Sequence, residues 1–247
     1  MTEKEIKEYW EKTTSDYQKE CKIPLDIHYG PGSPNEKKLK LLGRLKGKKV
    51  LELGCGGAQC GIAMANQGAE VRGMDISEEQ LKFAKKLADR DKVKINLIQG
   101  SFQNLSKFRS NSYDIVFSAF ALLYSPNIQT VFKQVYRILK KNGIFVFSLD
   151  HPFFNIVNPK TLKLKASYFK TGRYVEHFPS GKFVMYNHSV SELFNALVDA
   201  GFAVEKIIEP DSRKRYPYDP WYGLWDYTPK LLAMVPPTII FKCRKLR

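Results

Sequence analysis

The chain has 247 residues, of which 43% are hydrophobic, and its formal net charge is +15 at pH 7. This length and composition predict one large domain, or one and a half domains, with ample core. No apolar run is long enough to span a bilayer and the first residues are charged, so we expect neither a membrane helix nor a secretory signal. A cytoplasmic protein is therefore expected.

The positive charge has two interpretations. A basic surface can bind nucleic acid, whereas lysines can also serve only to keep a surface solvated. Most lysines are scattered at helical spacing, so we favour the second interpretation and keep nucleic acid as an open but less favoured partner.

The four cysteines do not indicate a metal site. They are Cys21, Cys55, Cys60 and Cys243, and no two of them form a C-x-x-C pair. Cys55 and Cys60 lie in and beside a glycine-rich turn, where small apolar residues fit. Reduced thiols and no metal are the expectation.

The N-terminal region predicts two helices joined by a loop. Residues 3–20 place aromatic side chains at roughly helical intervals, which indicates an amphipathic helix. Residues 26–35 are rich in Gly and Pro and predict a loop, followed by a short basic helix over residues 35–45. His28 lies in that loop. A loop histidine is most often only solvated, and a role in a site is about equally open here.

A buried strand, a glycine turn and a helix follow. Residues 50–53 form a short apolar run that ends in glycines, as a parallel strand does before a tight turn. Gly54 and Gly56 let the backbone turn sharply and approach a ligand closely. Residues 58–67 predict a helix whose free N-terminal amides face that ligand.

A second strand, residues 70–75, ends on Asp75, which can accept both hydroxyls of a ribose. A nicotinamide-dinucleotide site would require G-x-G-x-x-G, but the sixth position from Gly54 is Gln59. The segment instead resembles the glycine-rich motif of class I S-adenosylmethionine-dependent methyltransferases. In that family an acid stands two places before the first glycine, as Glu52 does here, and another ends the second strand.

The resemblance implies S-adenosyl-L-methionine as cofactor and S-adenosyl-L-homocysteine as product. It also implies a set of cofactor-binding residues: Tyr17, Glu52, Gly54, Cys55, Gly56, Asp75, Ile76, Ser101, Phe102 and Ser118. Tyr17 belongs to them because an N-terminal helix with Trp and Tyr often closes over the cofactor in related enzymes. Two positions depart from the family pattern. Ala58 replaces the usual third glycine, and Ser101 replaces the Asp that usually holds the adenine amino group. We therefore expect a weaker adenine contact, or one made by the Phe102 backbone N–H.

Alternating elements continue as far as residue 149. They are a helix over residues 77–88 with an N-cap at Ser77, strands over residues 93–99 and 113–118, a helix over residues 127–140 and a strand over residues 144–149. Residues 119–124 floor the cavity in which the methyl group would be presented, and Tyr124 is a catalytic candidate. They lack the N-P-P-Y-like motif of enzymes that methylate exocyclic base nitrogens. His151, after the last of these strands, is the best candidate for a general base. A purely structural hydrogen bond from His151 to its loop is about as well supported.

Two ring-rich segments depart from the minimal fold. Residues 155–190 combine many Lys and Arg with one acid, Glu176, and with alternating aromatic residues. This composition suits a β-rich cap over a substrate and also fits nucleic acid. Residues 213–227 hold so many rings in a Pro/Gly loop that several should wall a pocket. We expect both segments to form a lid over the acceptor site, with Tyr17 and His28 closing the same cavity.

The expected fold is α/β: a doubly wound, seven-stranded, mostly parallel sheet with helices on both faces, a final antiparallel strand and a cap inserted after the fifth strand. The expected organisation is an N-terminal helical lid (1–47), a cofactor-binding core (48–150), the inserted cap (155–190) and the C-terminal part of the sheet with its aromatic loop (191–247).

The expected activity is transfer of the sulfonium methyl group to an O, N or C nucleophile of a small, partly apolar acceptor. Candidate catalytic residues are His151, Tyr124 and His28. An RNA or tRNA methyltransferase that uses the basic cap is one alternative. A non-catalytic S-adenosylmethionine-binding subunit is another. Nothing in the sequence indicates an oligomeric state.

Overall fold

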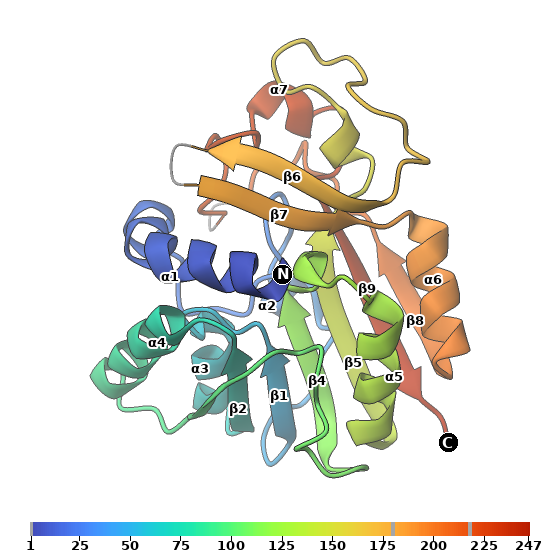
Figure 1. Cartoon of the computed structure of the whole chain (residues 1–247). Coiled ribbons are helices and arrows are strands. Elements are labelled where there is room, and N and C mark those ends of the chain that lie inside the picture. The colour runs from blue at the N-terminus through green and yellow to red at the C-terminus, as the bar shows by residue number, and fades with distance from the viewer. Residues whose placement is uncertain (1, 179–180, 217–218) are drawn as a thin grey trace.

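The computed structural model describes residues 2–178, 181–216 and 219–247 and arranges seven strands in one sheet. The strand order is β3-β2-β1-β4-β5-β9-β8 (Figure 1). The strands are β1 (Lys49–Leu53), β2 (Glu70–Asp75), β3 (Asn96–Gln99), β4 (Tyr113–Ala119), β5 (Leu139–Asp150), β8 (Phe202–Ile208) and β9 (Thr238–Lys245). β9 pairs antiparallel with both of its neighbours, and the other pairs are parallel. The predicted mostly parallel sheet with a final antiparallel strand is confirmed.

Helices cover both faces of this sheet. On one face, α3 (Gln59–Asn66) packs with the segment that contains α2 (Glu36–Leu39), and on the other lie α5 (Ile128–Ile138) and α6 (Val190–Asp199). α4 (Glu78–Arg90) contacts α3, β2 and β3. Side chains of a strand alternate between faces, so Val50 joins the cluster around α3, whereas Leu51 joins the cluster around α5 and α6.

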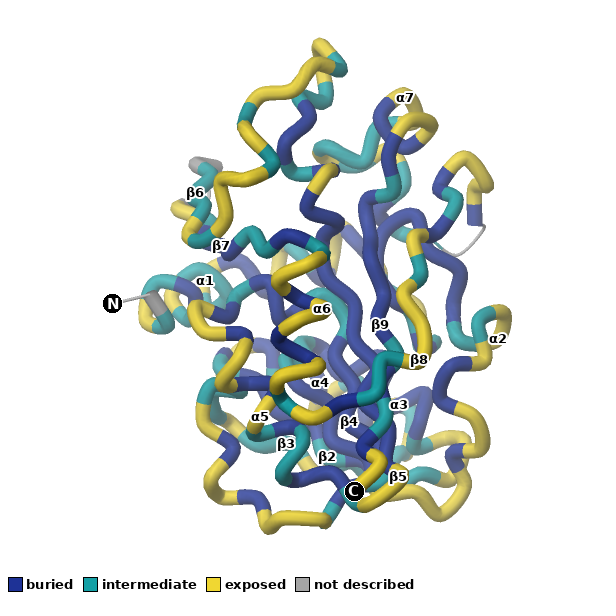
Figure 2. The backbone as a smooth tube through the Cα atoms, turned by 90° about the vertical axis from the view of Figure 1, so that its right-hand side faces the viewer, coloured by how far each residue is buried: buried dark blue, intermediate teal, exposed yellow. Residues whose placement is uncertain are grey.

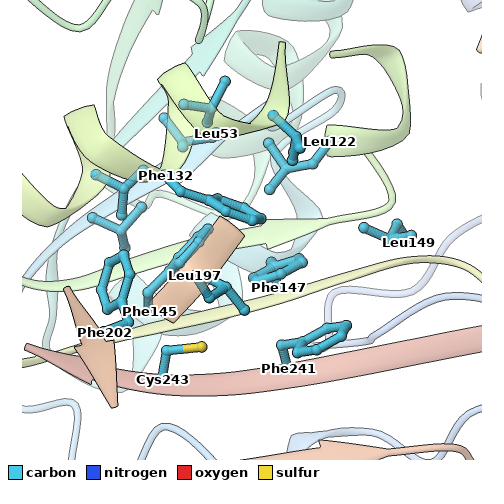
Figure 3. Close-up of a cluster of buried hydrophobic side chains, with 14 of the residues drawn as sticks. Leu53, Leu122, Phe132, Phe145, Phe147, Leu149, Leu197, Phe202, Phe241 and Cys243 are labelled. Atoms are coloured by element: carbon cyan, nitrogen blue, oxygen red, sulfur yellow. The ribbon is translucent and has the colours of Figure 1, made fainter. Parts of the chain in front are cut away.

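Stacked phenylalanines form the centre of the larger core cluster (Figure 3). The rings of Phe145 and Phe147 on β5 lie 4.7 Å apart, and that of Phe147 lies 5.1 Å from Phe241 on β9. Phe132 of α5 closes this stack from the helix side. Figure 2 shows the resulting gradient, in which the central strands are buried and the outward helix surfaces are exposed.

The inserted segment forms a hairpin of β6 (Gly172–Phe178) and β7 (Gly181–Asn187). The hairpin lies beyond the carboxyl ends of β4 and β5, with α7 (Pro229–Leu232) farther out (Figure 1). α1 (Thr2–Cys21) packs against both α4 and β7, so the N-terminal helix reaches the same edge of the sheet. Within the two predicted lid segments, residues 179–180 and 217–218 lie outside the described part of the chain.

One predicted helix is much shorter than expected. The helix predicted over residues 35–45 is only the four-residue α2, and Lys40 after it has a positive φ of 51°. The Glu36 carboxylate accepts hydrogen bonds from the backbone N–H groups of Leu41 and Leu42, at 2.9 and 2.7 Å. These amides are satisfied by a side chain instead of by helical carbonyls, so the helix ends after one turn.

Candidate active site

One cavity lies at the carboxyl ends of the central parallel strands, with a volume of about 590 Å³. Its walls come from α1, the glycine turn after β1, residues 119–124, the hairpin and the aromatic loop. Ligand cavities commonly have volumes of roughly 300–1,000 Å³. The structure thus brings the two predicted lid segments and the N-terminal helix to one space.

Most of the predicted site residues line this cavity. They are Tyr17, His28, Gly54, Cys55, Gly56, Asp75, Ile76, Ser101, Phe102 and Tyr124. Glu52, Ser118 and His151 are not among its described lining residues.

The glycine turn packs closely against its neighbours at Gly54. Gly54 has a φ of +64°, and a Cβ there would lie 2.2 Å from the Cβ of Ala121. Gly56 has a φ of +51°. Ala58, at the position of the missing third glycine, also adopts a positive φ of 56°. A non-glycine residue in this region costs about 1–2 kcal/mol, so the chain keeps the turn at the expense of local strain.

Asp75 is held in place by backbone amides. Its Oδ2 accepts from the N–H of Gly56 at 2.8 Å and its Oδ1 from that of Ser77 at 2.9 Å. Burial raises the pKa of this carboxyl, and these hydrogen bonds oppose the rise. Each carboxylate oxygen can accept more than one hydrogen bond, so capacity for a ligand hydroxyl remains.

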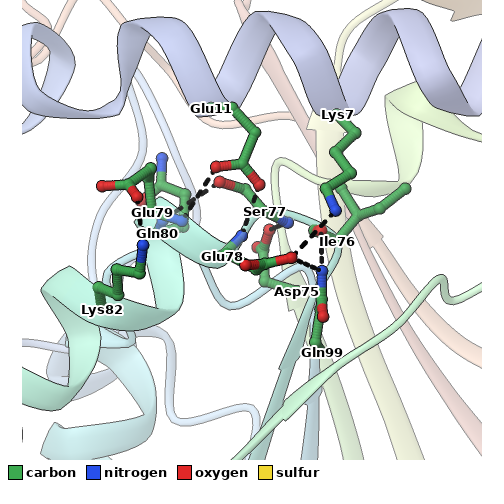
Figure 4. A network of polar contacts seen from close by, with 10 residues as sticks. All are labelled: Lys7, Glu11, Asp75, Ile76, Ser77, Glu78, Glu79, Gln80, Lys82 and Gln99. Carbon is green, nitrogen blue, oxygen red and sulfur yellow. Dashed lines mark hydrogen bonds and ion pairs between the residues drawn. The ribbon is translucent and has the colours of Figure 1, made fainter.

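α1 is fastened beside Asp75 by polar contacts (Figure 4). The Glu11 carboxylate accepts from the backbone N–H groups of Glu78 and Glu79, at 2.8 and 3.2 Å, and so caps the start of α4. Lys7 donates to Glu78 at 3.2 Å. The predicted N-cap at Ser77 is present, accepting from the N–H of Gln80.

Three buried glutamines also join α1 to the glycine turn. Gln59 donates to Gln18 at 2.7 Å, and Gln18 donates to Gln80 at 3.0 Å. All three line the cavity, and they connect α3, α1 and α4 in that order. Their sequence separation hides this network from pattern analysis.

Beside Ser101 the cavity contains a carboxylate that the sequence did not predict. Ser101 is hydrogen-bonded to the carboxylate of Glu3, which comes from α1 and lines the cavity. Ile76 and Phe102 line the same cavity. The first turn of α1 therefore places an acid beside the position where Ser101 replaces an Asp.

Glu52 lies under α3 and not in the cavity. A Cβ on Gly61, in the first turn of α3, would lie 2.5 Å from Glu52 Oε2. Burial raises the pKa of Glu52 to about 8, and the Gly61 amide opposes that rise. Ala58 offers no side-chain cap to α3. Glu52 is therefore buried beneath the first turn of α3, outside the cavity.

The histidines take different positions. His28 lines the cavity, and burial lowers its pKa to about 4, so its ring is neutral at pH 7. Both ring nitrogens of His151 are engaged outside the cavity. Its Nδ1 accepts from the N–H of Phe153 at 3.1 Å, and its Nε2 lies 2.8 Å from Glu209. The accepting Nδ1 leaves the proton on Nε2, which donates to Glu209. We therefore do not retain His151 as a base.

Ser118 is likewise engaged in the sheet. Its hydroxyl donates to the carbonyl of Leu53 at 2.9 Å. The residue is fully buried on β4, so its contribution to the site is to hold the ends of β1 and β4 together.

Aromatic side chains and Asp150 form the outer part of the cavity. Trp10 lies edge-on to Tyr17 and Tyr124, with ring centroids 5.2 and 6.0 Å apart. Tyr17 also stacks with Trp225 of the aromatic loop at 6.2 Å. Asp150, at the end of β5, lines the same cavity, and sequence reasoning named its neighbour instead. We call this outer part of the cavity, which is lined by Asp150 and by rings that include Trp10, Tyr17, Tyr124, Phe183, Trp225 and Tyr227, the acceptor compartment.

Among residues 2–178, 181–216 and 219–247, no helix is both long and apolar enough to cross a bilayer. The same residues contain no group of three or more His, Cys, Asp or Glu side chains placed to hold a metal ion.

Comparison with known proteins identifies relatives in sequence and in fold. A family model described as "Methyltransferase domain" matches residues 51–147. The uncharacterized methyltransferase YbaJ of Bacillus subtilis is 32% identical over 180 residues, which cover 67% of this chain and 69% of the relative. A protein from Listeria monocytogenes proposed to be an S-adenosylmethionine-dependent methyltransferase superposes with a TM-score of 0.69 at 25% identity, over 86% of this chain and 97% of that one. Geranyl diphosphate C-methyltransferase from Streptomyces coelicolor, solved with S-adenosyl-L-homocysteine, shares the fold, with a TM-score of 0.62 at 15% identity over 85% of this chain and 77% of that one.

Proposed function

The chain belongs to the class I S-adenosylmethionine-dependent methyltransferases, and we propose that it methylates a small, partly apolar acceptor held in the acceptor compartment. The observation that carries this proposal is one cavity shared by several elements of the fold. It is lined at one end by the glycine turn and Asp75 and at the other by rings from α1, the hairpin and the aromatic loop. A nucleotide-like cofactor and a small acceptor would meet there.

The residues present fit S-adenosylmethionine. Asp75 is oriented by two amides and retains capacity for the ribose hydroxyls. Gly54 and Gly56 line the cavity without side chains, so the cofactor would be able to approach the main chain of the turn closely. Ile76 and Phe102 would lie against the adenine.

The Glu3 carboxylate would accept from the adenine amino group. It takes the place of the acid that the motif carries at position 101, and its contact with Ser101 holds it there. The adenine contact therefore depends on α1, which also supplies Tyr17 and Gln18 to the cavity.

When bound, S-adenosylmethionine supplies a methyl group on a positively charged sulfur, which is a good leaving group. The chain then has to align the acceptor and exclude water. Trp10 and Tyr124 form an apolar wall with Phe183, and the contacts of α1 with α4 hold this wall over the strand ends. Tyr124 and neutral His28 remain candidates for hydrogen bonding to the acceptor.

A transfer assay tests this proposal. Methyl-labelled S-adenosylmethionine is incubated with the protein and with pools of small aromatic acceptors that carry amine, hydroxyl or carboxylate groups. The expected result is acceptor-dependent release of S-adenosylhomocysteine in at least one pool, and its loss in a Tyr124→Ala variant. A protein that binds the cofactor but labels RNA and none of the pools would favour the RNA alternative. That alternative further requires RNA affinity that falls several-fold per doubling of salt.

A further inference from the structure

The described wall of the cavity is acidic, although the chain as a whole has a net charge of +15. Its charged lining residues are the acids Glu3, Asp16, Glu20, Asp75, Asp150, Glu176 and Asp226, and the base Lys165. A recess lined by one sign of charge concentrates ligands of the other sign. The cavity therefore favours ligands with a net positive charge and disfavours ligands with a net negative charge, such as phosphates.

One of these acids is buried with an unused oxygen. Asp150 is 9% exposed, and its Oδ1 has no hydrogen-bond partner within the described part of the chain. A buried polar atom without a hydrogen bond costs free energy, and a hydrogen-bond donor on a ligand would recover that free energy. Asp150 lines the acceptor compartment, so the missing donor belongs to whatever occupies that space.

Aromatic rings stand around the same space. Tyr124 lies edge-on to Phe183, with ring centroids 5.6 Å apart, and both line the cavity with Tyr227. Burial raises the pKa values of Tyr124 and Tyr227, and the nearby Asp150 charge raises them further. A carboxylate beside aromatic faces is suited to an ammonium group, which the ring quadrupoles also attract.

On the basis of the function proposed above, we propose that the acceptor is a primary or secondary amine, which enters as an ammonium ion and is held between Asp150 and the rings of the acceptor compartment. An N–H bond of the ammonium breaks and its proton moves to the Asp150 carboxylate. The freed nitrogen lone pair then forms the new C–N bond, and the electrons of the broken C–S bond return to sulfur. The products are a protonated Asp150, a methylated ammonium ion and a neutral thioether.

The protonation behaviour of Asp150 suits this role. Burial raises its pKa to about 7, Glu176 adds to the rise, and the neighbouring polar side chains of Tyr227 and Asn155 oppose it. An acid with a pKa near the working pH is an efficient proton acceptor. The groups that face it from the packed elements are Tyr124, Asn155, Lys165, Glu176, Asp226 and Tyr227, and Lys165 is paired with Glu176 at 3.7 Å.

Binding of three matched probes tests the proposal: benzylamine, benzyl alcohol and benzoate. Each is titrated into the whole protein, with and without S-adenosylhomocysteine, and its Kd is measured by calorimetry or ligand-observed NMR. The expected order is benzylamine far ahead of benzyl alcohol, with no benzoate binding. Benzylamine affinity should rise between pH 6 and pH 8, as Asp150 ionises. Equal or better binding of the neutral or anionic probe would overturn the proposal.

Asp150→Asn keeps the shape of the side chain and removes its charge. We expect roughly a 10- to 100-fold loss of benzylamine affinity and a flat pH dependence, with unchanged affinity for S-adenosylhomocysteine. The matched control is Asp89→Asn, on an exposed part of α4 where Asp89 pairs with Lys85. Unchanged benzylamine binding in Asp150→Asn would contradict the amine proposal. Failure of the wild-type protein to bind S-adenosylhomocysteine would contradict the proposed function instead, and the cofactor-free titrations still decide the amine question.

Discussion

Replacement of Asp75 by Ala is expected to weaken cofactor binding far more than it weakens the fold. In the structure, the carboxylate accepts from two backbone amides and is 9% exposed. Asp75→Ala removes the ribose acceptor entirely. Asp75→Asn keeps the volume but turns a donor group toward the N–H of either Gly56 or Ser77, so it also disturbs the turn.

The magnitude follows from the kind of bond that is lost. A hydrogen bond to a charged acceptor is worth about 1.5–3 kcal/mol, which corresponds to roughly a 10- to 150-fold increase in Kd. The effect on stability is smaller. Burial raises the pKa of Asp75, so the folded state already disfavours its charge at neutral pH. Relief of that charge offsets part of the lost amide hydrogen bonds.

Calorimetric titration with S-adenosylhomocysteine measures this effect directly. Wild-type protein, Asp75→Ala and the surface control Asp89→Ala are compared, and thermal melting of each variant confirms that it is folded. We expect the control to match wild type and Asp75→Ala to lose affinity by the stated factor. A folded Asp75→Ala protein with wild-type Kd would refute the assignment of Asp75 to the ribose.

Three further predictions concern other parts of the site. Glu3→Gln should raise the Kd for S-adenosylhomocysteine by about 10-fold, because it removes the charge-assisted contact with the adenine amino group. The affinity for an analogue without that amino group should not change. Equal losses of affinity for both ligands would contradict this prediction. Burial raises the folded-state pKa of Glu52 to about 8, so the free energy of unfolding should fall as pH rises from about 4.5 to 8. In denaturant titrations, Glu52→Gln should reduce this dependence on pH. The same pH dependence in both proteins would argue against the prediction. Hydrogen exchange in the segments 155–190 and 213–227 should slow on addition of S-adenosylhomocysteine, as expected of a lid, and unchanged exchange would mean that these rings are structural.

The local elements of this fold could be predicted from the sequence. The strand, glycine turn, helix and second strand lie within 26 consecutive residues, 50–75, and their patterns are set by neighbours in the chain. β2 has the predicted bounds. Helix 35–45 was predicted too long because its end depends on a glutamate side chain, not on helix propensity.

The site was less predictable, because its polar contacts join distant residues. Glu3 and Ser101 are 98 positions apart, and Gln18 lies 62 positions from Gln80. At the end of β5, successive side chains point to opposite sides. The sequence could identify the pair of residues 150–151, but only the packing around it shows that Asp150, and not His151, faces the cavity.

A crystal structure of the protein with S-adenosylhomocysteine bound tests most directly whether one cavity holds both cofactor and acceptor. We expect ribose hydroxyls within hydrogen-bonding distance of Asp75, the adenine amino group at Glu3, and the sulfur facing the acceptor compartment near Tyr124 and Asp150. A ligand bound away from the glycine turn, or a sulfur that faces away from the rings, would contradict the proposal that one cavity holds both cofactor and acceptor.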